Sequence, residues 1–520
     1  MSNNKKIIKK QLHEHYEILK NSHLSDLFSN DKNRGKHFTS KFHNLLIDYS
    51  KNHITDETLE LLLNYAKELD IKKSINAMFS GKEINVTEGC AVLHHALRAK
   101  PEKVLVLKDD EIIKEIKDEL KNIKRFVSLV HDKKLTGWTN KPFDTYVNIG
   151  IGGSDLGTKM VVNALNQYRE EKTRSFFISN IDGEQIELLK KTINPETTLF
   201  IISSKSFKTI ETTTNADVIK SWLLKSGCDD ISKHFVAVTS NFETAKDFGI
   251  GKENIFKTWN WVGGRFSLWS AVGLPVALAI GFENFEKMLL GAYKLDEHFL
   301  SEPLEKNIPI ILALIDYWYI NFYGAPTHAI IPYDESLHYF PSYLSQLFME
   351  SNGKSTDRSG NIVSHKTGAI VWGAIGTNSQ HSVSQLLHQG KHVVPIDFLA
   401  PLMKKGDQNH HELLLANCLA QSRALMQGEN NKKSFLNFDG NKPSTTILYN
   451  ELTPETLGSL LAIYEHRVFV QGLLLEINSF DQYGVELGKK VALDISKKLA
   501  NKEKNINTDS STQNLIDIYI

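Results

Sequence analysis

The chain of 520 residues is long enough for two or more packed domains, because single domains usually hold about 100 to 200 residues. Its 61 basic and 61 acidic residues cancel, which gives no sign of a nucleic-acid or membrane-surface partner and favours a small-molecule substrate. Cys90, Cys228 and Cys418 are widely spaced, unlike a disulfide framework or a thiolate metal cluster, and predict reduced thiols.

The N-terminal part of the chain is expected to be helical. Residues 1–20 mix Lys, His and Glu without an apolar stretch of signal-peptide length, which predicts a cytoplasmic protein. From about Leu24 to Lys100, apolar residues such as Phe38, Phe42 and Leu45 recur at steps of three and four. We therefore expect a helical segment over residues 1–115.

From Tyr146 the pattern changes to short β-rich runs separated by amphipathic stretches, which is typical of parallel βαβ units. In a first α/β domain, residues 116–285, we expect the strands Tyr146–Ile151, Phe176–Ser179, Leu199–Ser203, Phe235–Thr239 and Ile255–Trp259. In a second, residues 286–500, we expect the strands His328–Pro332, Ala369–Trp372 and Val393–Phe398. The predicted fold class is α/β, with two doubly wound domains built on parallel-sheet cores.

Two further stretches are expected to be helical. Phe266–Phe282 is apolar but only 17 residues long and contains Pro275, so it falls short of the ~20 residues of a membrane span and predicts a buried core helix. Pro454–Lys498 is largely helical in pattern, and a tail over residues 501–520 follows it, either frayed or packed on a neighbour.

The sequence IGIGGSDLG, Ile149–Gly157, joins an expected strand to a helix, where backbone N–H groups can receive an anion. Neither nucleotide fingerprint fits. The third position of the dinucleotide motif falls on Asp155, whose carboxylate repels a pyrophosphate, and Thr158-Lys159 reverse the Lys-Ser/Thr order of a Walker loop. A tight turn without a ligand is the alternative.

A second loop, Ser204–Thr209, precedes a helix expected to begin near Ile210. The hydroxyls of Ser204, Ser206 and Thr209 can donate to an oxyanion together with the first N–H groups of that helix. Ordinary N-capping is the alternative. Two such loops at the carboxyl ends of strands in one α/β domain predict a crevice for a monophosphate.

A candidate base lies at the end of a third helical pattern, Leu344–Lys354. Gln346 and Glu350 lie one helical turn apart and share a face, among apolar neighbours. Partial burial would suit Glu350 for proton transfer, whereas a solvated surface carboxylate is the alternative.

Three cations have positions that suit a supporting role. Arg265 follows two glycines at the start of the apolar stretch, where it could stabilise an enediolate oxygen or form a structural ion pair. His381 lies just past a strand and could relay a ring-opening proton, although a lone histidine more often satisfies a buried hydrogen bond. Lys489 follows Gln482 by two helical turns if one helix covers both, and most such lysines only coat a helix with charge.

Other chemistries lack their residues. The sequence has no Gly-x-Ser-x-Gly elbow and no CxxC, and His410-His411-Glu412 lacks the HExxH order of a zinc helix. We therefore expect neither a metal nor a cofactor.

Taken together, several stretches resemble the glucose-6-phosphate isomerase family over nearly the full length of the chain. They are IGIGGSDLG, GGRFSLWSAVGLP, MESNGKS, GTNSQHSVSQLLHQG and GSLLAIYEHRVFVQGLLLEINSFDQYGVELGKK, with the weaker DYSKN at Asp48–Asn52 and INVTEG at Ile84–Gly89. The resemblance implies two sugar-isomerase-type (SIS) domains and a homodimer. It also implies reversible conversion of D-glucose 6-phosphate to D-fructose 6-phosphate, through ring opening and a cis-enediol(ate), in glycolysis and gluconeogenesis.

The resemblance also assigns roles to residues. It makes Glu350 the base, Arg265 the enediolate stabiliser, His381 the ring-opening histidine contributed by the partner subunit, and Lys489 the lysine at the sugar ring. The implied substrate- and phosphate-binding positions are Gly153, Ser154, Ser204, Lys205, Ser206, Thr209, Gly264, Gln346 and Gln482.

The chain departs from the family pattern at two places. Cys90 stands where the family commonly has arginine, and Ala374-Ile375 replace a frequent Glu-Pro. Neither change removes a group that the chemistry needs.

Two alternatives stay open. A non-catalytic sugar-phosphate-binding protein with the same domains could dispense with Glu350, Arg265 and His381, all of which are present. An isomerase of a related hexose phosphate would keep them.

Overall fold

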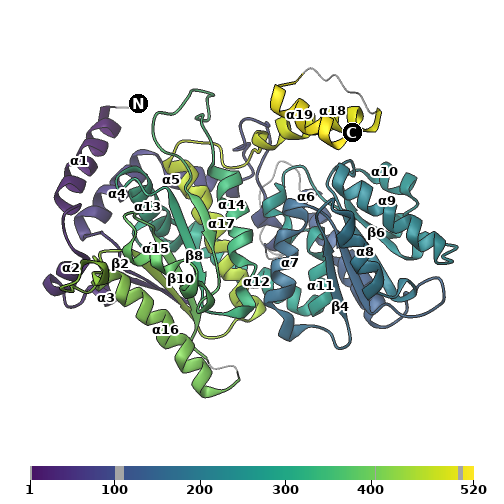
Figure 1. Cartoon of the computed structure of the whole chain (residues 1–520), viewed down its shortest axis with the longest axis horizontal. Helices are drawn as coiled ribbons and strands as arrows, with labels where there is room; N and C mark the ends of the chain where they lie inside the picture. Colours follow the sequence, from purple (N-terminus) through teal and green to yellow (C-terminus); the bar gives the residue numbers. More distant parts are fainter. Residues whose placement is uncertain (1–2, 100–110, 404–405, 502–507) are drawn as a thin grey trace. The chain divides into compact units, whose positions relative to one another are not determined.

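The computed structural model describes residues 3–99, 111–403, 406–501 and 508–520. The chain divides into two compact units, Met1–Ser479 and Phe480–Ile520. The first unit contains two β-sheets with their covering helices (Figure 1). The second contains α18 (Glu486–Asn501) and α19 (Ser510–Tyr519), so the C-terminal tail has a helix of its own.

The first sheet has five parallel strands in the order β4-β3-β5-β6-β7. Their bounds are Thr145–Ile149 (β3), Arg174–Ile178 (β4), Thr198–Ser203 (β5), Phe235–Thr239 (β6) and Ile255–Lys257 (β7). All five expected strands of this sheet are confirmed. Because the second strand in sequence lies on one side of the first and the later strands on the other, the winding changes direction between β3 and β5.

Helices cover both faces of the first sheet, which is why its central strands read as continuous apolar runs. On one face, Val147 and Phe200 belong to a buried cluster with side chains of α8 (Gly183–Thr192), α9 (Ile210–Lys225) and α10 (Phe242–Phe248). Helix α11 (Leu274–Ile280) packs against both α6 (Glu111–His131) and α7 (Leu156–Ala164), and α6 and α11 contact the strands.

The second sheet has six strands in the order β1-β2-β11-β10-β8-β9. Their bounds are Thr39–Phe42 (β1), Leu45–Lys51 (β2), Thr327–Pro332 (β8), Ile370–Gly373 (β9), Ile396–Pro401 (β10) and Ser444–Tyr449 (β11). Strands β8 to β11 are parallel, as expected for a doubly wound core, whereas the β1–β2 hairpin runs antiparallel to β11. The three expected strands are confirmed, and β11 is an addition.

The expectation of helix around Phe38, Phe42 and Leu45 is wrong, because this stretch forms the β1–β2 hairpin. Along β2, Leu45, Ile47 and Tyr49 are buried, and Leu46 and Asp48 between them are less so, which is the two-residue period of a strand with one covered face. Between residues 80 and 99 the N-terminal segment forms turns, an isolated bridge between Asn85 and Cys90 and the 3₁₀ turn His94–Arg98, and its other described residues are mostly helical. Its α-helices are α1 (Asn3–Leu19), α2 (Leu24–Asn30), α3 (Arg34–His37), α4 (Asp56–Glu68) and α5 (Ile71–Phe79).

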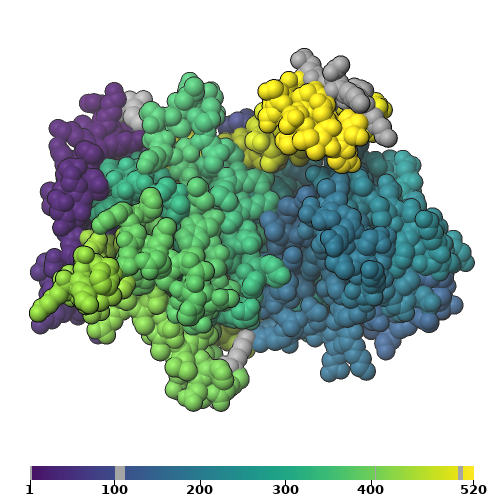
Figure 2. All heavy atoms as spheres, viewed as in Figure 1, coloured from purple at the N-terminus to yellow at the C-terminus, as the bar shows by residue number. Residues whose placement is uncertain are grey.

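Long buried helices form the interior beside the second sheet. α17 (Pro454–Leu474) packs against α12 (Phe282–Ser301) and α13 (Ile308–Asn321), and nearly every residue of α17 is buried. The remaining helices of this region are α14 (Phe340–Asn352), α15 (Ser384–Gln389) and α16 (Gln408–Gln427). One end of α16 projects at the lower edge of the view (Figures 1 and 2).

The apolar stretch Phe266–Phe282 is buried, as expected, but it is not one helix. It begins as the 3₁₀ turns Gly264–Trp269 and Ala271–Gly273 and becomes helical only in α11. A Cβ atom on Gly273 would lie 2.5 Å from the Leu268 carbonyl oxygen, so the chain folds back tightly there. In the described part of the chain, no helix is long and apolar enough to cross a membrane.

The expected domain boundaries at residues 115, 285 and 500 stay predictions. The two sheets lie within one compact unit, and β1 and β2, from the N-terminal segment, belong to the second sheet.

Candidate active site

The two expected anion-binding loops lie side by side at the carboxyl edge of the first sheet. The Gly150–Ser154 loop follows β3 and leads into α7, and the Ser204–Thr209 loop follows β5 and leads into α9. Because β3 and β5 are neighbours at the point where the winding reverses, both loops border the crevice in which doubly wound folds bind ligands.

The hydroxyl groups of the Ser204–Thr209 loop converge without acting as helix caps. Ser204 Oγ lies 3.2 Å from Thr209 Oγ1, and Ser206 Oγ accepts a bond from the Lys208 backbone N–H at 3.3 Å. Thr209 occupies the N-cap position of α9 but makes no side-chain capping bond. The capping alternative therefore does not account for Thr209, and the loop keeps the composition of an anion site.

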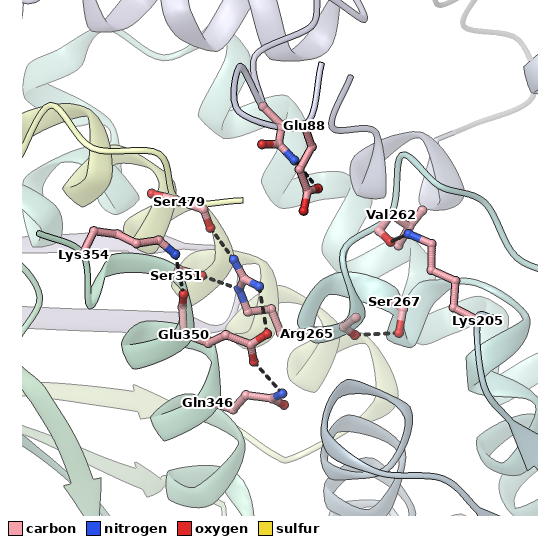
Figure 3. Close-up of polar contacts among 12 residues, drawn as sticks. Glu88, Lys205, Val262, Arg265, Ser267, Gln346, Glu350, Ser351, Lys354 and Ser479 are labelled. Atoms are coloured by element: carbon pink, nitrogen blue, oxygen red, sulfur yellow. Dashed lines mark hydrogen bonds and ion pairs between the residues drawn. The ribbon is translucent and has the colours of Figure 1, made fainter. Parts of the chain in front are cut away.

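Lys205 anchors this loop to the segment that follows β7. Its Nζ donates to the carbonyl oxygens of Asn260 and Val262 at 3.0 and 3.2 Å (Figure 3). Partial removal from water lowers the pKa of Lys205 from its usual value, and the charge of Glu88 opposes that shift. The ammonium thus binds backbone dipoles at the edge of the predicted phosphate site.

The Gly150–Ser154 loop approaches the arginine segment so closely that only glycine fits. A Cβ atom on Gly153 would lie 2.1 Å from the carbonyl carbon of Gly264 and 2.6 Å from the Arg265 nitrogen. A Cβ atom on Gly152 would lie 3.3 Å from Gln346 Nε2. The glycines therefore bring the loop against both Arg265 and the helix that carries the candidate base.

Arg265 and Glu350 form the centre of the site (Figure 3). Arg265 Nη1 donates to Glu350 Oε1 at 3.2 Å, Nε donates to Ser351 Oγ at 2.6 Å, and Nη2 donates to the Ser479 carbonyl at 2.5 Å. The guanidinium is fully buried, whereas the Glu350 side chain keeps 22% of its exposure. A fixed positive charge thus lies beside a carboxylate that a ligand can reach.

Gln346 supports Glu350 from one turn earlier in α14. Its Nε2 donates to Glu350 Oε2 at 2.7 Å, which confirms the predicted shared face. Gln346 Oε1 is buried and has no hydrogen-bond partner among the described residues, so it can accept a bond from a ligand hydroxyl.

The end of α14 is held by buried polar contacts. Asn352 Nδ2 donates to Gln471 Oε1 at 2.7 Å and to the Val468 carbonyl at 3.0 Å, both in α17. Ser479 Oγ donates to Asn352 Oδ1 at 2.7 Å. Because Asn352 follows Glu350 by two residues, these contacts fix the candidate base relative to the interior of the molecule.

The structure does not bring His381 into this group. His381 ends the 3₁₀ turn Asn378–His381 and is exposed. Within the described part of the chain, no hydrogen bond or ion pair joins it to Arg265 or Glu350. Its assignment to ring opening stays a prediction.

Gln482 and Lys489 lie in the second compact unit. One helix does not cover both residues, because Gln482 precedes the 3₁₀ turn Tyr483–Val485 and α18 begins only at Glu486. Within that unit, Lys489 Nζ contacts Glu486 Oε1 at 3.0 Å. The roles of both residues at the substrate stay predictions.

Sequence reasoning missed the side chains that hold the site together. Ser351, Ser479 and Asn148 lie inside or next to the quoted motifs, but nothing in their spacing indicates which atoms they bind. Asp155 is 2% exposed, and its Oδ1 has no hydrogen-bond partner among the described residues. Burial raises the pKa of Asp155 to about 6, against the lowering effects of the Lys159 charge and of hydrogen bonds with the side chains of Ser179 and Asn148.

The arrangement can move a proton next to a phosphorylated substrate. It supplies an accessible carboxylate, a buried cation for a developing oxyanion and a neighbouring loop rich in hydroxyl groups. Across the described ranges, no group of three or more His, Cys, Asp or Glu side chains is placed to hold a metal ion.

Comparison with known proteins finds relatives that match nearly the whole chain. The family profile described as phosphoglucose isomerase matches residues 48–516. A glucose-6-phosphate isomerase from Campylobacter jejuni subsp. doylei is 47% identical over 97% of this chain and 96% of its own length. One from Buchnera aphidicola subsp. Schizaphis graminum is 48% identical over 98% of this chain and 96% of its own.

Solved structures give the same picture. The crystal structure of a glucose-6-phosphate isomerase from Chlamydia trachomatis aligns with a TM-score of 0.89 at 33% identity and covers 99% of each chain. A hypothetical protein from Thermus thermophilus aligns with a TM-score of 0.68 at 26% identity and covers 86% of this chain.

Proposed function

The chain belongs to the phosphoglucose isomerase family, and we propose that Glu350 is the base with which it interconverts D-glucose 6-phosphate and D-fructose 6-phosphate. The protein is an aldose–ketose isomerase, and its reaction belongs to glycolysis and gluconeogenesis. The contact of Glu350 with buried Arg265, beside the loop at Gly153, is the observation that carries the assignment.

Phosphate capture comes first. The hydroxyls of Ser204, Ser206 and Thr209, with the N–H groups that begin α9, hold the phosphate of the substrate. Lys205, Gly153, Ser154, Gly264, Gln346 and Gln482 complete the set of substrate contacts that we infer. Binding energy gained at the phosphate orients the reacting carbons near Glu350.

Ring opening and proton transfer follow. His381 and Lys489 assist proton movement between the ring oxygen and the C1 oxygen. Glu350 then removes the C2 proton, Arg265 stabilises the cis-enediol(ate), and Glu350 returns the proton to C1. Aldose and ketose are isomers, so the sequence of steps consumes no external reductant or oxidant.

We infer that the active form is a homodimer in which His381 reaches the partner's site. Six large apolar side chains between residues 402 and 436 are exposed and so are accessible to a partner subunit. They are Leu402, Met403, Leu413, Leu419, Phe435 and Leu436. The three cysteines are free thiols, which suits the reducing cytoplasm as the place of the reaction.

A coupled assay tests the function. The enzyme should form fructose 6-phosphate from glucose 6-phosphate in the presence of a chelator. Binding without turnover would instead indicate a sugar-phosphate sensor. Faster turnover of a mannose or amino-sugar phosphate would indicate a related isomerase.

A further inference from the structure

Asn148 is a buried amide in β3, a strand of the first sheet that is buried along its whole length. It lies next to the last residue of β3 and is 1% exposed, between the apolar residues Val147 and Ile149. An amide in such a position is costly unless both of its ends are hydrogen-bonded. Its partners therefore indicate why the position is polar.

The two ends of Asn148 bind the two loops of the site. Nδ2 donates to the Ser154 carbonyl at 3.0 Å, and Oδ1 accepts from Ser203 Oγ at 2.8 Å. Because a carbonyl only accepts, the contact with Ser154 fixes which end of the amide carries the nitrogen. Ser154 ends the Gly150–Ser154 loop, and Ser203 immediately precedes the Ser204–Thr209 loop.

The loop that Asn148 holds is tightly enclosed on both sides. A Cβ atom on Gly150 would lie 3.1 Å from the Ser203 carbonyl oxygen, and one on Gly153 would lie 2.1 Å from the carbonyl carbon of Gly264. A shift of this loop would therefore be transmitted to the end of β5 on one side and to the Arg265 segment on the other.

We propose that Asn148 is a positioning residue that ties the Ser204–Thr209 loop to the Gly150–Ser154 loop and so aligns a bound sugar phosphate with Glu350 and Arg265. It binds no substrate itself. The proposal rests on the proposed function only in taking a hexose 6-phosphate as the ligand. Without the bridge, the phosphate still binds at Ser204–Thr209, but the sugar loses its alignment.

Two ligands separate these effects. In the proposed function, inorganic phosphate occupies the site at Ser204–Thr209, whereas sorbitol 6-phosphate also reaches Gly153 and Ser154. Sorbitol 6-phosphate cannot react, because it has no carbonyl group. In Asn148→Ala, we expect sorbitol 6-phosphate affinity, measured by calorimetry, to fall about five- to tenfold, because the displaced Gly150–Ser154 loop loses about one hydrogen bond to the sugar. Phosphate affinity should stay within about twofold of wild type.

Ser203→Ala provides a milder variant, and Thr198→Ala is its matched control. Thr198 Oγ1 donates to the Asn194 carbonyl at 2.6 Å, at the opposite end of the same strand β5, so its loss affects stability without touching either loop. Ser203→Ala should lower the affinity for sorbitol 6-phosphate but not the affinity for phosphate, and Thr198→Ala should lower neither affinity. If Asn148→Ala does not fold, Ser203→Ala decides the question.

If both affinities fall equally, or if neither changes more than in the Thr198→Ala control, the bridging role is overturned. Turnover is a separate test, because measuring these affinities does not require catalysis. A wild-type protein that fails to isomerise glucose 6-phosphate contradicts the proposed function, whatever the ratio of the two affinities. A folded variant whose kcat/KM falls without a change in phosphate affinity supports the bridge.

Discussion

Arg265 and Glu350 are in direct contact, at 3.2 Å, although one follows the first sheet and the other ends a helix of the second. Two further nitrogens of Arg265 donate to Ser351 Oγ and to the Ser479 carbonyl, and these bonds hold the guanidinium in place. Glu350 has no such enclosure and keeps part of its surface exposed. The pair thus combines a stationary cation with a carboxylate that can exchange protons.

Replacing Glu350 tests the base. Glu350→Gln keeps the size and the hydrogen bonding of the side chain but removes the basic oxygen. We expect kcat to fall by about 10²–10⁴-fold, the usual contribution of a general base, with little change in sorbitol 6-phosphate affinity. Coupled kinetics and calorimetry measure the two effects. Turnover unchanged from wild type would sink the proton-transfer assignment.

Removing the Ser351 hydroxyl tests how Arg265 is held. In Ser351→Ala the buried Nε loses its acceptor at 2.6 Å, so we expect about 1–3 kcal/mol less stability and at least about a tenfold loss of kcat. Ser345→Ala is the control, because Ser345 Oγ, in the same helix, donates to the Pro341 and Val371 carbonyls instead. A control that loses as much kcat as Ser351→Ala would contradict the role of Ser351.

Asp155 gives a pH-dependent stability with a definite sign. Its pKa rises to about 6 in the folded protein, so between about pH 4 and 6 the folded state binds more protons than the unfolded state. Asp155 therefore lowers the free energy of unfolding as pH rises through that window, and it has no such effect below the window. Asp155→Asn should gain up to about 3 kcal/mol relative to wild type between pH 4 and 7.

Urea unfolding of both proteins at several pH values measures this gain. If the difference in unfolding free energy between the two proteins stays constant from pH 4 to 7, or if the variant becomes less stable relative to wild type as pH rises, then the pKa of Asp155 is not raised in the folded protein.

Mixing inactive subunits tests whether His381 acts across the dimer. His381→Ala and Glu350→Gln subunits are dissociated, combined and reassociated. If His381 serves the partner's site, each heterodimer has one site with both defects and one with neither, and random mixing gives about a quarter of wild-type activity. If heterodimers verified by mass stay inactive, His381 does not act in the partner's site, and its role would be assigned to the site of its own chain.

Local sequence patterns predicted most of the strands and loops of the first sheet that form the candidate site. The strand ends and the glycine and hydroxyl loops depend on neighbouring residues, so β3, β5 and the Ser204–Thr209 loop follow from short sequence windows. The pairing of Gln346 with Glu350 likewise follows from helical spacing alone.

Long-range partners were not predictable in the same way. The β1–β2 hairpin has apolar residues that satisfy both helical and strand spacing, and only pairing with β11, far along the chain, decides between them. Ser351, Ser479 and Asn148 gain their roles from partners in other segments, and a short hydroxyl or amide side chain gives no local sign of such a partner.

The pairing of β2 with β11 also sets an order for synthesis on the ribosome. Strand β2 ends at Lys51, whereas β11 is complete only at Tyr449, so at about 5–20 residues per second the hairpin is made roughly 20–80 s before its partner. The five strands of the first sheet, by contrast, all lie between Thr145 and Lys257 and can pair while the rest is still being translated. The nascent N-terminus must therefore keep an unpaired strand edge from aggregating during that interval, a task that suits a chaperone or the preceding helices.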